Sequence, residues 1–144
     1  MKPFLHFVLA AGLLLTATAC QINRTKNHER VGKWVTTMSQ DDQLMTIRAK
    51  YNRKGLGKGS WRYHLDGKLY KREVYDRRGN CFVTAFHANG NTAVTGQTRL
   101  ETNPSGIHWF YTGDWLYFDE AGTLTRVSHY KHGALIRETQ IEKK

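Results

Sequence analysis

The stretch from residue 59 to residue 79 constrains the fold of this chain more than any other feature. Its first half alternates large apolar residues with polar ones, its centre is Asp66-Gly67, and its second half returns as far as Tyr75. An Asp-Gly pair between strand-like runs is a strong signal for a β-hairpin, because a type I′ turn requires a positive φ at both central positions. The stretch therefore predicts two antiparallel strands joined by a tight turn.

The second strand of this hairpin does not alternate regularly. Trp61, Tyr63 and Leu65 share one face of the first strand, whereas Tyr70 and Tyr75 fall on opposite faces of the second. Either a β-bulge or a sheet that is partly covered on both faces would produce such a pattern.

The same unit recurs along the chain in three copies. In the central and C-terminal copies a glycine lies eight residues before a tyrosine, and a Trp-x-Tyr pair precedes the glycine. The N-terminal copy has Asp41-Asp42 in place of the turn glycine. The copies align on Trp34, Tyr51 and Gly55; on Trp61, Gly67, Tyr75 and Gly79; and on Trp115, Gly122, Tyr130 and Gly133.

This pattern resembles the bacterial MORN-type repeat in its variant form, over roughly residues 32 to 137. That family includes antitoxin components of toxin–antitoxin pairs and secreted lipoproteins of unknown role. The resemblance implies consecutive antiparallel hairpins in a twisted meander, and it carries no catalytic residues to transfer.

The remaining segments also favour strands and turns. Residues 44–51 are expected to form a strand rather than a short helix, although their composition suits both. The glycine-rich basic segment 53–59 is interpreted as a connecting loop, since no helix follows it as a phosphate-binding loop requires. Further turns are predicted at Asn89-Gly90, as a type I′ turn, and at Gly113-Asp114. The prediction is an all-β domain of about seven to ten strands.

The first twenty residues predict where the protein is directed in the cell. A basic start, an apolar run from Phe4 to Leu15 and small residues before Cys20 are typical of a secretory signal peptide. The run is too short for a membrane span of about 20 residues. Small residues before a cysteine resemble the bacterial lipobox, which implies cleavage between Ala19 and Cys20 and lipid attachment at Cys20. An ordinary secretory peptide that leaves Cys20 as a thiol is the alternative.

The expected organisation is a lipoprotein signal peptide at 1–19, a lipidated N-terminus with a flexible tether at 20–32, a repeat domain at 33–141 and a solvated tail at 142–144. If the host is Gram-negative, Gln21 after the lipidated residue implies the outer membrane, facing the periplasm. Lipidation leaves Cys81 without an intramolecular partner, and its apolar neighbours favour burial over a free thiol or an intermolecular bridge.

Charge indicates the kind of partner. The formal net charge is +10, which favours anionic lipid, an anionic envelope polymer or an acidic protein. Nucleic acid is a poor candidate partner outside the cytoplasm. Basic residues near the anchor are also able to hold the protein on its own membrane.

No motif predicts catalysis, a metal or a cofactor. His129 and His132 lie near a predicted turn without carboxylates or thiolates at matching spacing, so we expect no metal site. The acidic pairs Asp41-Asp42 and Asp119-Glu120 also lie at predicted turns, where such residues form local hydrogen bonds. We therefore expect no catalytic residues and predict that the protein is not an enzyme.

The four tryptophans are interpreted mainly as core residues, with a stacking surface for sugar or peptide as the alternative. Exposed cations of the central hairpin and the turn that follows are better candidates for a contact surface, although they also suit a solvated face. These candidate binding residues are Arg62, Lys71, Arg72, Arg77 and Arg78.

The function predicted from the sequence is a non-enzymatic envelope lipoprotein, a binding or structural module that contacts a protein or an anionic envelope component through a basic sheet face. One alternative is an immunity or antitoxin-type protein that neutralises an envelope-acting toxin. Another is a protein that binds or acts on cell-wall carbohydrate. An enzyme of this kind requires clustered carboxylates or a metal site, and a pocket with a carboxylate beside exposed tryptophan would favour carbohydrate chemistry.

Overall fold

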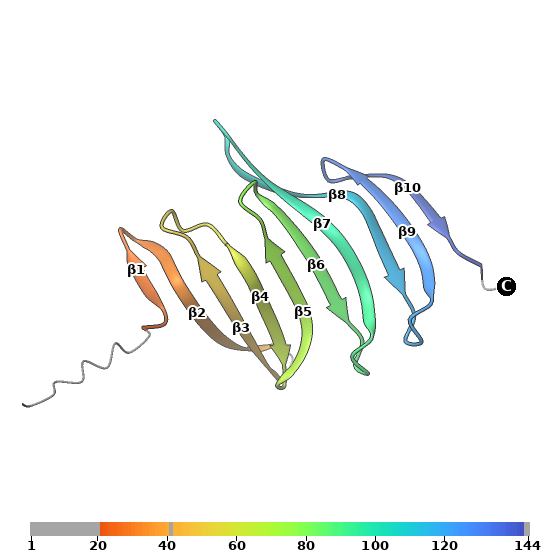
Figure 1. The fold of residues 1–144 in the computed structure, drawn as a ribbon, viewed down its shortest axis with the longest axis horizontal. Coiled ribbons are helices and arrows are strands. Elements are labelled where there is room, and N and C mark those ends of the chain that lie inside the picture. The colour runs from red at the N-terminus through yellow and green to blue at the C-terminus, as the bar shows by residue number, and fades with distance from the viewer. Residues whose placement is uncertain (1–20, 41, 143–144) are drawn as a thin grey trace, which may run out of the picture.

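The computed structural model of this protein describes residues 21–40 and 42–142, without the side chain of Gln40. These residues form one open antiparallel sheet of ten strands, which follow each other in chain order (Figure 1). The all-β meander predicted from the hairpin signals is therefore confirmed. The predicted signal peptide, its cleavage site and Cys20 lie outside the described residues. The described part contains no helix long and apolar enough to cross a bilayer.

The ten strands carry the labels of Figure 1. They are β1 (Arg24–Lys26), β2 (Glu29–Gln40), β3 (Gln43–Tyr51), β4 (Gly59–Leu65), β5 (Lys68–Tyr75), β6 (Asn80–Phe86), β7 (Thr92–Asn103), β8 (Gly106–Phe118), β9 (Leu124–Lys131) and β10 (Ala134–Gln140).

The central hairpin has the predicted turn and the predicted irregularity. Asp66 and Gly67 have φ values of 47° and 79°, as a type I′ turn requires. A register shift between Tyr63 and His64 shows that a β-bulge explains the broken alternation. In the β2–β3 turn Asp42 adopts a φ of 61°, so this aspartate takes the conformation that glycine has elsewhere.

Three other turns share one hydrogen-bonding pattern, which the glycine spacing alone did not predict. Asn52, Asp76 and Asp119 each begin a turn whose fourth residue is a glycine with positive φ. In each, the side-chain Oδ1 accepts hydrogen bonds from the backbone N–H groups two and four residues later. The polar side chain thus substitutes for backbone partners that the chain reversal leaves unpaired.

Two turn predictions were wrong. At Asn89-Gly90 only the glycine has a positive φ, and the Gly90 N–H donates to the His87 carbonyl, so the reversal is longer than a type I′ turn. Gly113-Asp114 lies inside β8, where the register with β7 shifts between Thr95 and Gln97. Gly113, with a φ of 68°, is therefore part of an irregularity within a continuous strand and not part of a chain reversal.

The N-terminal segment is more ordered than a tether. Residues 24–26 pair with residues 29–31 as a short hairpin, and the Asn23 side chain bonds the backbone of Val35. The expected strand at 44–51 is confirmed as β3, and the basic glycine-rich segment is confirmed as the connection to β4.

Aromatic rings cover one side of the sheet, which we call the aromatic face. Its first cluster crosses β2 to β5, where each ring contacts the next at centroid distances of 6.2, 4.9 and 5.0 Å. These rings are Trp34, Tyr51, Trp61 and Tyr75. Because no described segment forms a second layer over the sheet, such cross-strand contacts supply much of the apolar packing.

The interpretation of the tryptophans as core is right for Trp115 and wrong for Trp109. Trp115 is 6% exposed and stacks on Tyr111 at 4.2 Å, whereas Trp109 is 55% exposed near the tip of the β7–β8 hairpin. Burial of Cys81, which is 3% exposed, is confirmed.

Candidate binding surface

The side of the sheet opposite the aromatic face carries an unusual row of cations. Arg48 in β3 lies directly opposite Arg62 in β4, and Arg62 lies directly opposite Arg72 in β5. Directly paired residues of an antiparallel sheet project to the same side. The three arginines therefore stand next to each other across three neighbouring strands, and we call them the arginine row.

The arginine row has no counter-charge in the described part of the chain. All three residues are exposed, and no side chain among the described residues forms an ion pair or hydrogen bond with their guanidinium groups. The neighbours at its two ends, Val35 on β2 and Thr84 on β6, are uncharged. Like charges directly opposite each other destabilise a sheet by a few tenths of a kcal/mol to about 1 kcal/mol per pair. The folded sheet thus tolerates an unfavourable arrangement.

Lysines extend the positive charge of this side toward β2. Lys50, two residues beyond Arg48, lies on the same side of β3 and opposite Lys33 on β2. The positions of β3 to β6 on this side contain no aspartate or glutamate. We call the arginine row together with Lys50 the basic face.

The structure separates the five predicted binding residues into three places. Arg62 and Arg72 belong to the arginine row. Lys71 projects from the aromatic face, where its Nζ lies 3.0 Å from Glu73 Oε1 and 3.9 Å from the Tyr63 ring centroid. Arg77 and Arg78 lie in the turn between β5 and β6.

The sequence reasoning did not select Arg48 or Lys50. The alternation Thr46, Arg48, Lys50 within β3 was a signal that these side chains share a face. Their place opposite Arg62 depends on a strand register that the sequence does not reveal.

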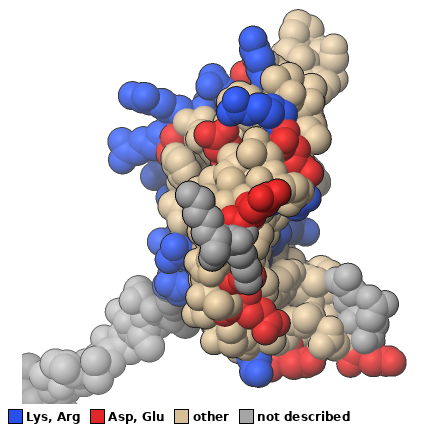
Figure 2. Space-filling view, turned by 90° about the vertical axis from the view of Figure 1, so that its right-hand side faces the viewer, with Lys and Arg blue, Asp and Glu red and all other residues tan. Residues whose placement is uncertain are grey.

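The turns at the two ends of the strands also differ in charge. The β3–β4 and β5–β6 turns lie at one end and contain five cations, Arg53, Lys54, Lys58, Arg77 and Arg78, and one carboxylate, Asp76. The described turns at the other end contain Asp42, Asp66, Asp119 and Glu120. Figure 2 shows lysine and arginine gathered toward the upper end and left side of this view, with acidic residues in the middle and toward the lower end. The basic turns thus extend the positive charge beyond the basic face.

A buried carboxylate organises the centre of the aromatic face. Glu73 is 8% exposed, and its Oε2 accepts hydrogen bonds of 2.7 Å from the hydroxyls of both Tyr63 and Tyr75. Burial, reinforced by these bonds to the carboxylate, raises the pKa of both tyrosines. Burial and then the Glu73 charge raise the pKa of the Cys81 thiol to about 11. This cluster therefore keeps its hydroxyls and thiol protonated at neutral pH, which suits a structural role.

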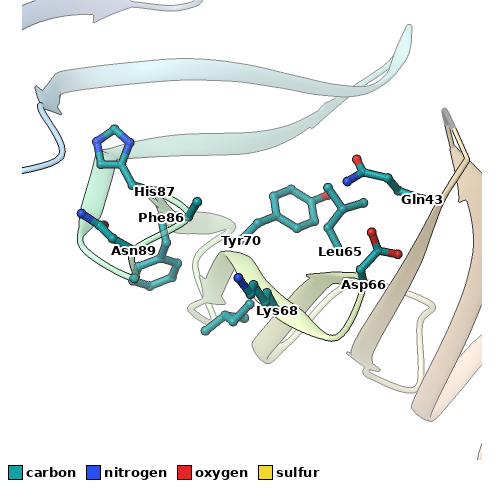
Figure 3. Close-up of a pocket in the computed structure, with 11 residues that line it drawn as sticks. Gln43, Leu65, Asp66, Lys68, Tyr70, Phe86, His87 and Asn89 are labelled. Atoms are coloured by element: carbon teal, nitrogen blue, oxygen red, sulfur yellow. The ribbon is translucent and has the colours of Figure 1, made fainter.

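A cleft lies where β5 and β6 separate. Their pairing stops at Lys71 and Ala85, and beyond it the β4–β5 hairpin and the β6–β7 turn leave a space of about 730 Å³. Figure 3 shows Leu65 and Asp66 on one side of this cleft and His87, Phe86 and Asn89 on the other, with Tyr70 and Lys68 between them. It contains a carboxylate but no tryptophan, so it lacks the combination that would favour carbohydrate chemistry.

His129, His132 and Asp119, which were considered for chemistry, have local partners. His129 Nδ1 lies 2.7 Å from Asp114 Oδ1, and the His132 ring packs against Phe110 at 5.3 Å. Asp119 caps its own turn, and Asp41 lies outside the described residues. No three His, Cys, Asp or Glu side chains within the described ranges are grouped as metal ligands would be.

No protein-family model matches this chain, and no match was found among the curated proteins or the solved structures. The resemblance to MORN-variant repeats therefore stays a prediction from the aromatic and glycine spacing.

Proposed function

We propose that this protein is a non-enzymatic binding module of the bacterial envelope, anchored through lipid at Cys20, and that its basic face binds an anionic envelope component. The observation that carries the proposal is the arginine row, in which three exposed cations stand side by side without a counter-charge in the described part of the chain. An anionic partner would remove the repulsion that the folded sheet tolerates.

The aromatic face is less suited to this role. Its cations have partners within the sheet, as Lys71 has in Glu73, and Arg30 lies over the ring of Trp34 at 4.8 Å. The basic face also differs from the far half of the same side, where Arg99 pairs with Glu101 at 3.0 Å. Unpaired positive charge is therefore concentrated over β3 to β5 and the neighbouring basic turns.

Retention on heparin, a polyanion with sulfate and carboxylate groups, tests this proposal. In the face variant Arg48, Arg62 and Arg72 become glutamine, and in the matched turn variant Arg53, Lys54 and Arg77 become glutamine. Both variants lose three charges. We expect the face variant to elute at clearly lower salt than the turn variant, because exposed charges act over only about 10 Å at 0.1 M salt.

Equal shifts for the two variants would contradict the proposal, because they would show that net charge alone retains the protein. After the expected larger shift of the face variant, a pull-down from envelope extract with wild-type protein and this variant would identify the natural partner, as the component that wild type retains at moderate salt and the variant does not.

A further inference from the structure

The hydrogen-bond donors of the arginine row indicate which class of anion the basic face binds. A guanidinium is planar, carries five N–H donors and has no acceptor, so each arginine of the row offers a fork of donors to a ligand. Neighbouring strands lie about 4.8 Å apart, so adjacent guanidinium groups are close enough to share one small anion. The row has two such gaps, one between Arg48 and Arg62 and one between Arg62 and Arg72.

A phosphate group suits these gaps better than a carboxylate. A carboxylate has two oxygens, and a single arginine satisfies both in a bidentate pair. A terminal phosphate has three oxygens in a tetrahedral arrangement, so it can accept from one guanidinium and still present an oxygen to the next. Two gaps in line therefore match two phosphates in line.

The residues around the row fit the same ligand. Lys50 adds a fourth cation on the same side of β3, and Thr84, opposite Arg72, has a hydroxyl at the other end of the row. None of the positions of β3 to β6 on this side would repel an anion, because none is acidic.

We infer that Arg48, Arg62 and Arg72 form a binding site for an oligophosphate, a group of two or more linked phosphates. This inference rests on the proposed function and specifies the chemistry of its anionic ligand. The arginine row binds the linked phosphates through charge-assisted hydrogen bonds across β3, β4 and β5, and the basic turns contribute only long-range attraction.

Thermal unfolding of the full chain with sodium pyrophosphate tests the site, with sodium sulfate at equal ionic strength as the reference anion. A ligand that binds only the folded state raises Tm. We expect pyrophosphate to raise the Tm of the wild type more than sulfate does. In the variant Arg48→Lys, Arg62→Lys, Arg72→Lys, which keeps every charge, we expect at least a tenfold loss of pyrophosphate affinity by calorimetry.

The matched control is Arg53→Lys, Arg77→Lys, Arg78→Lys, which makes the same three replacements in the basic turns and should keep wild-type affinity. Equal affinity of the row variant and the wild type would overturn the inference, and so would equal Tm shifts with pyrophosphate and sulfate. In both cases face-dependent retention on heparin would still support the proposed function, so the two failures are distinguishable.

Two further measurements distinguish a lost contact from unfolding, and linked phosphates from a lipid phosphate. Arg62→Gln removes the central charge, so we expect it to unfold at a higher temperature than wild type at low salt while binding pyrophosphate more weakly. Pyrophosphate affinity equal to that of the wild type in this folded variant would overturn the inference. Binding to vesicles that contain phosphatidic acid, without binding to free pyrophosphate, would overturn the assignment of linked phosphates.

Discussion

At the scale of single residues, the packing of Trp115 depends on the missing side chain at Gly96. A Cβ built at Gly96 would overlap the Trp115 indole, and the indole Nε1–H donates to the Gln97 carbonyl at 3.2 Å. The indole therefore lies directly on the backbone of β7, which a side chain at position 96 would prevent.

Gly96→Ala should destabilise the protein by about 1–3 kcal/mol, the usual cost of overpacking a well-packed site. Urea unfolding measures this free energy. In a Trp115→Leu background the same replacement should cost much less, because the overlapping ring is gone. An equal cost in both backgrounds would show that the indole is not the group that excludes the side chain.

The tyrosines that bond Glu73 predict how stability depends on alkaline pH. Their folded-state pKa values are raised above the ordinary value of 10.0. The unfolded chain therefore loses these protons first, and the stabilisation is present below pH 10 and lost as the pH rises above it. Cys81 adds to the loss from about pH 9, its ordinary value, because its pKa is also raised.

Urea unfolding from pH 8 to pH 11 should therefore show stability that falls with pH, and more gently in Tyr75→Phe. A variant with the same alkaline slope as the wild type would contradict the assignment of the slope to Tyr75. Glu73→Gln should also flatten the slope, since it removes the carboxylate charge next to both hydroxyls.

At the scale of elements, the capped turns set where strands end. Asp76 Oδ1 accepts from the N–H groups of Arg78 and Asn80 at 2.7 and 2.9 Å, and bonds from Asn80 hold the Asp76 pKa below its ordinary value of 3.8. The equivalent turn of the same chain begins with Asn52, which makes the same pair of bonds with a neutral amide.

Asp76→Ala should therefore lower stability and increase the hydrogen exchange of the Arg78 and Asn80 amides, whereas Asp76→Asn should retain most of the native behaviour. Exchange measured residue by residue by NMR distinguishes these results. Unchanged exchange in Asp76→Ala would show that the side-chain cap does not order the turn.

The edge strand β10 should open more readily than the central strands. All seven of its residues are exposed, and among the described strands it pairs with β9 alone, whereas β6 pairs on both sides and contains the buried Cys81. Amides of β10 should exchange faster than those of β6. Slower exchange in β10 than in β6 would contradict an open sheet with β10 at its edge.

The strands and turns could largely be predicted from the sequence. The face of the sheet from which each side chain projects could not. Asp66-Gly67 and the recurring glycines identify hairpins, because positive φ is a local requirement of the chain. The register shift at Tyr63 and the irregularity around Gly113 change the face of the sheet from which the side chains project. Both irregularities depend on packing between strands. Lys71 was grouped with Arg72 by composition alone, although neighbouring residues of a strand project from opposite faces.

At the scale of the whole molecule, the sheet has two unlike faces and two unlike ends. Aromatic rings and the Glu73 cluster stabilise one face, so the other face is free to carry charge that does not contribute to stability. Composition alone predicted the excess of positive charge, but only the pairing of β3, β4 and β5 shows where it is unpaired. Arg48 was missed because its partners lie far along the sequence.

The most direct test of the central claim is an NMR titration of the arginine side chains. Each Nε–Hε group of the ¹⁵N-labelled chain gives its own signal, and a short heparin-derived oligosaccharide serves as the anionic probe. We predict large, saturable shifts for Arg48, Arg62 and Arg72 and small, salt-sensitive shifts for Arg77 and Arg78. Shifts of equal size at all five arginines, or larger shifts at the turn, would contradict a binding site on the basic face.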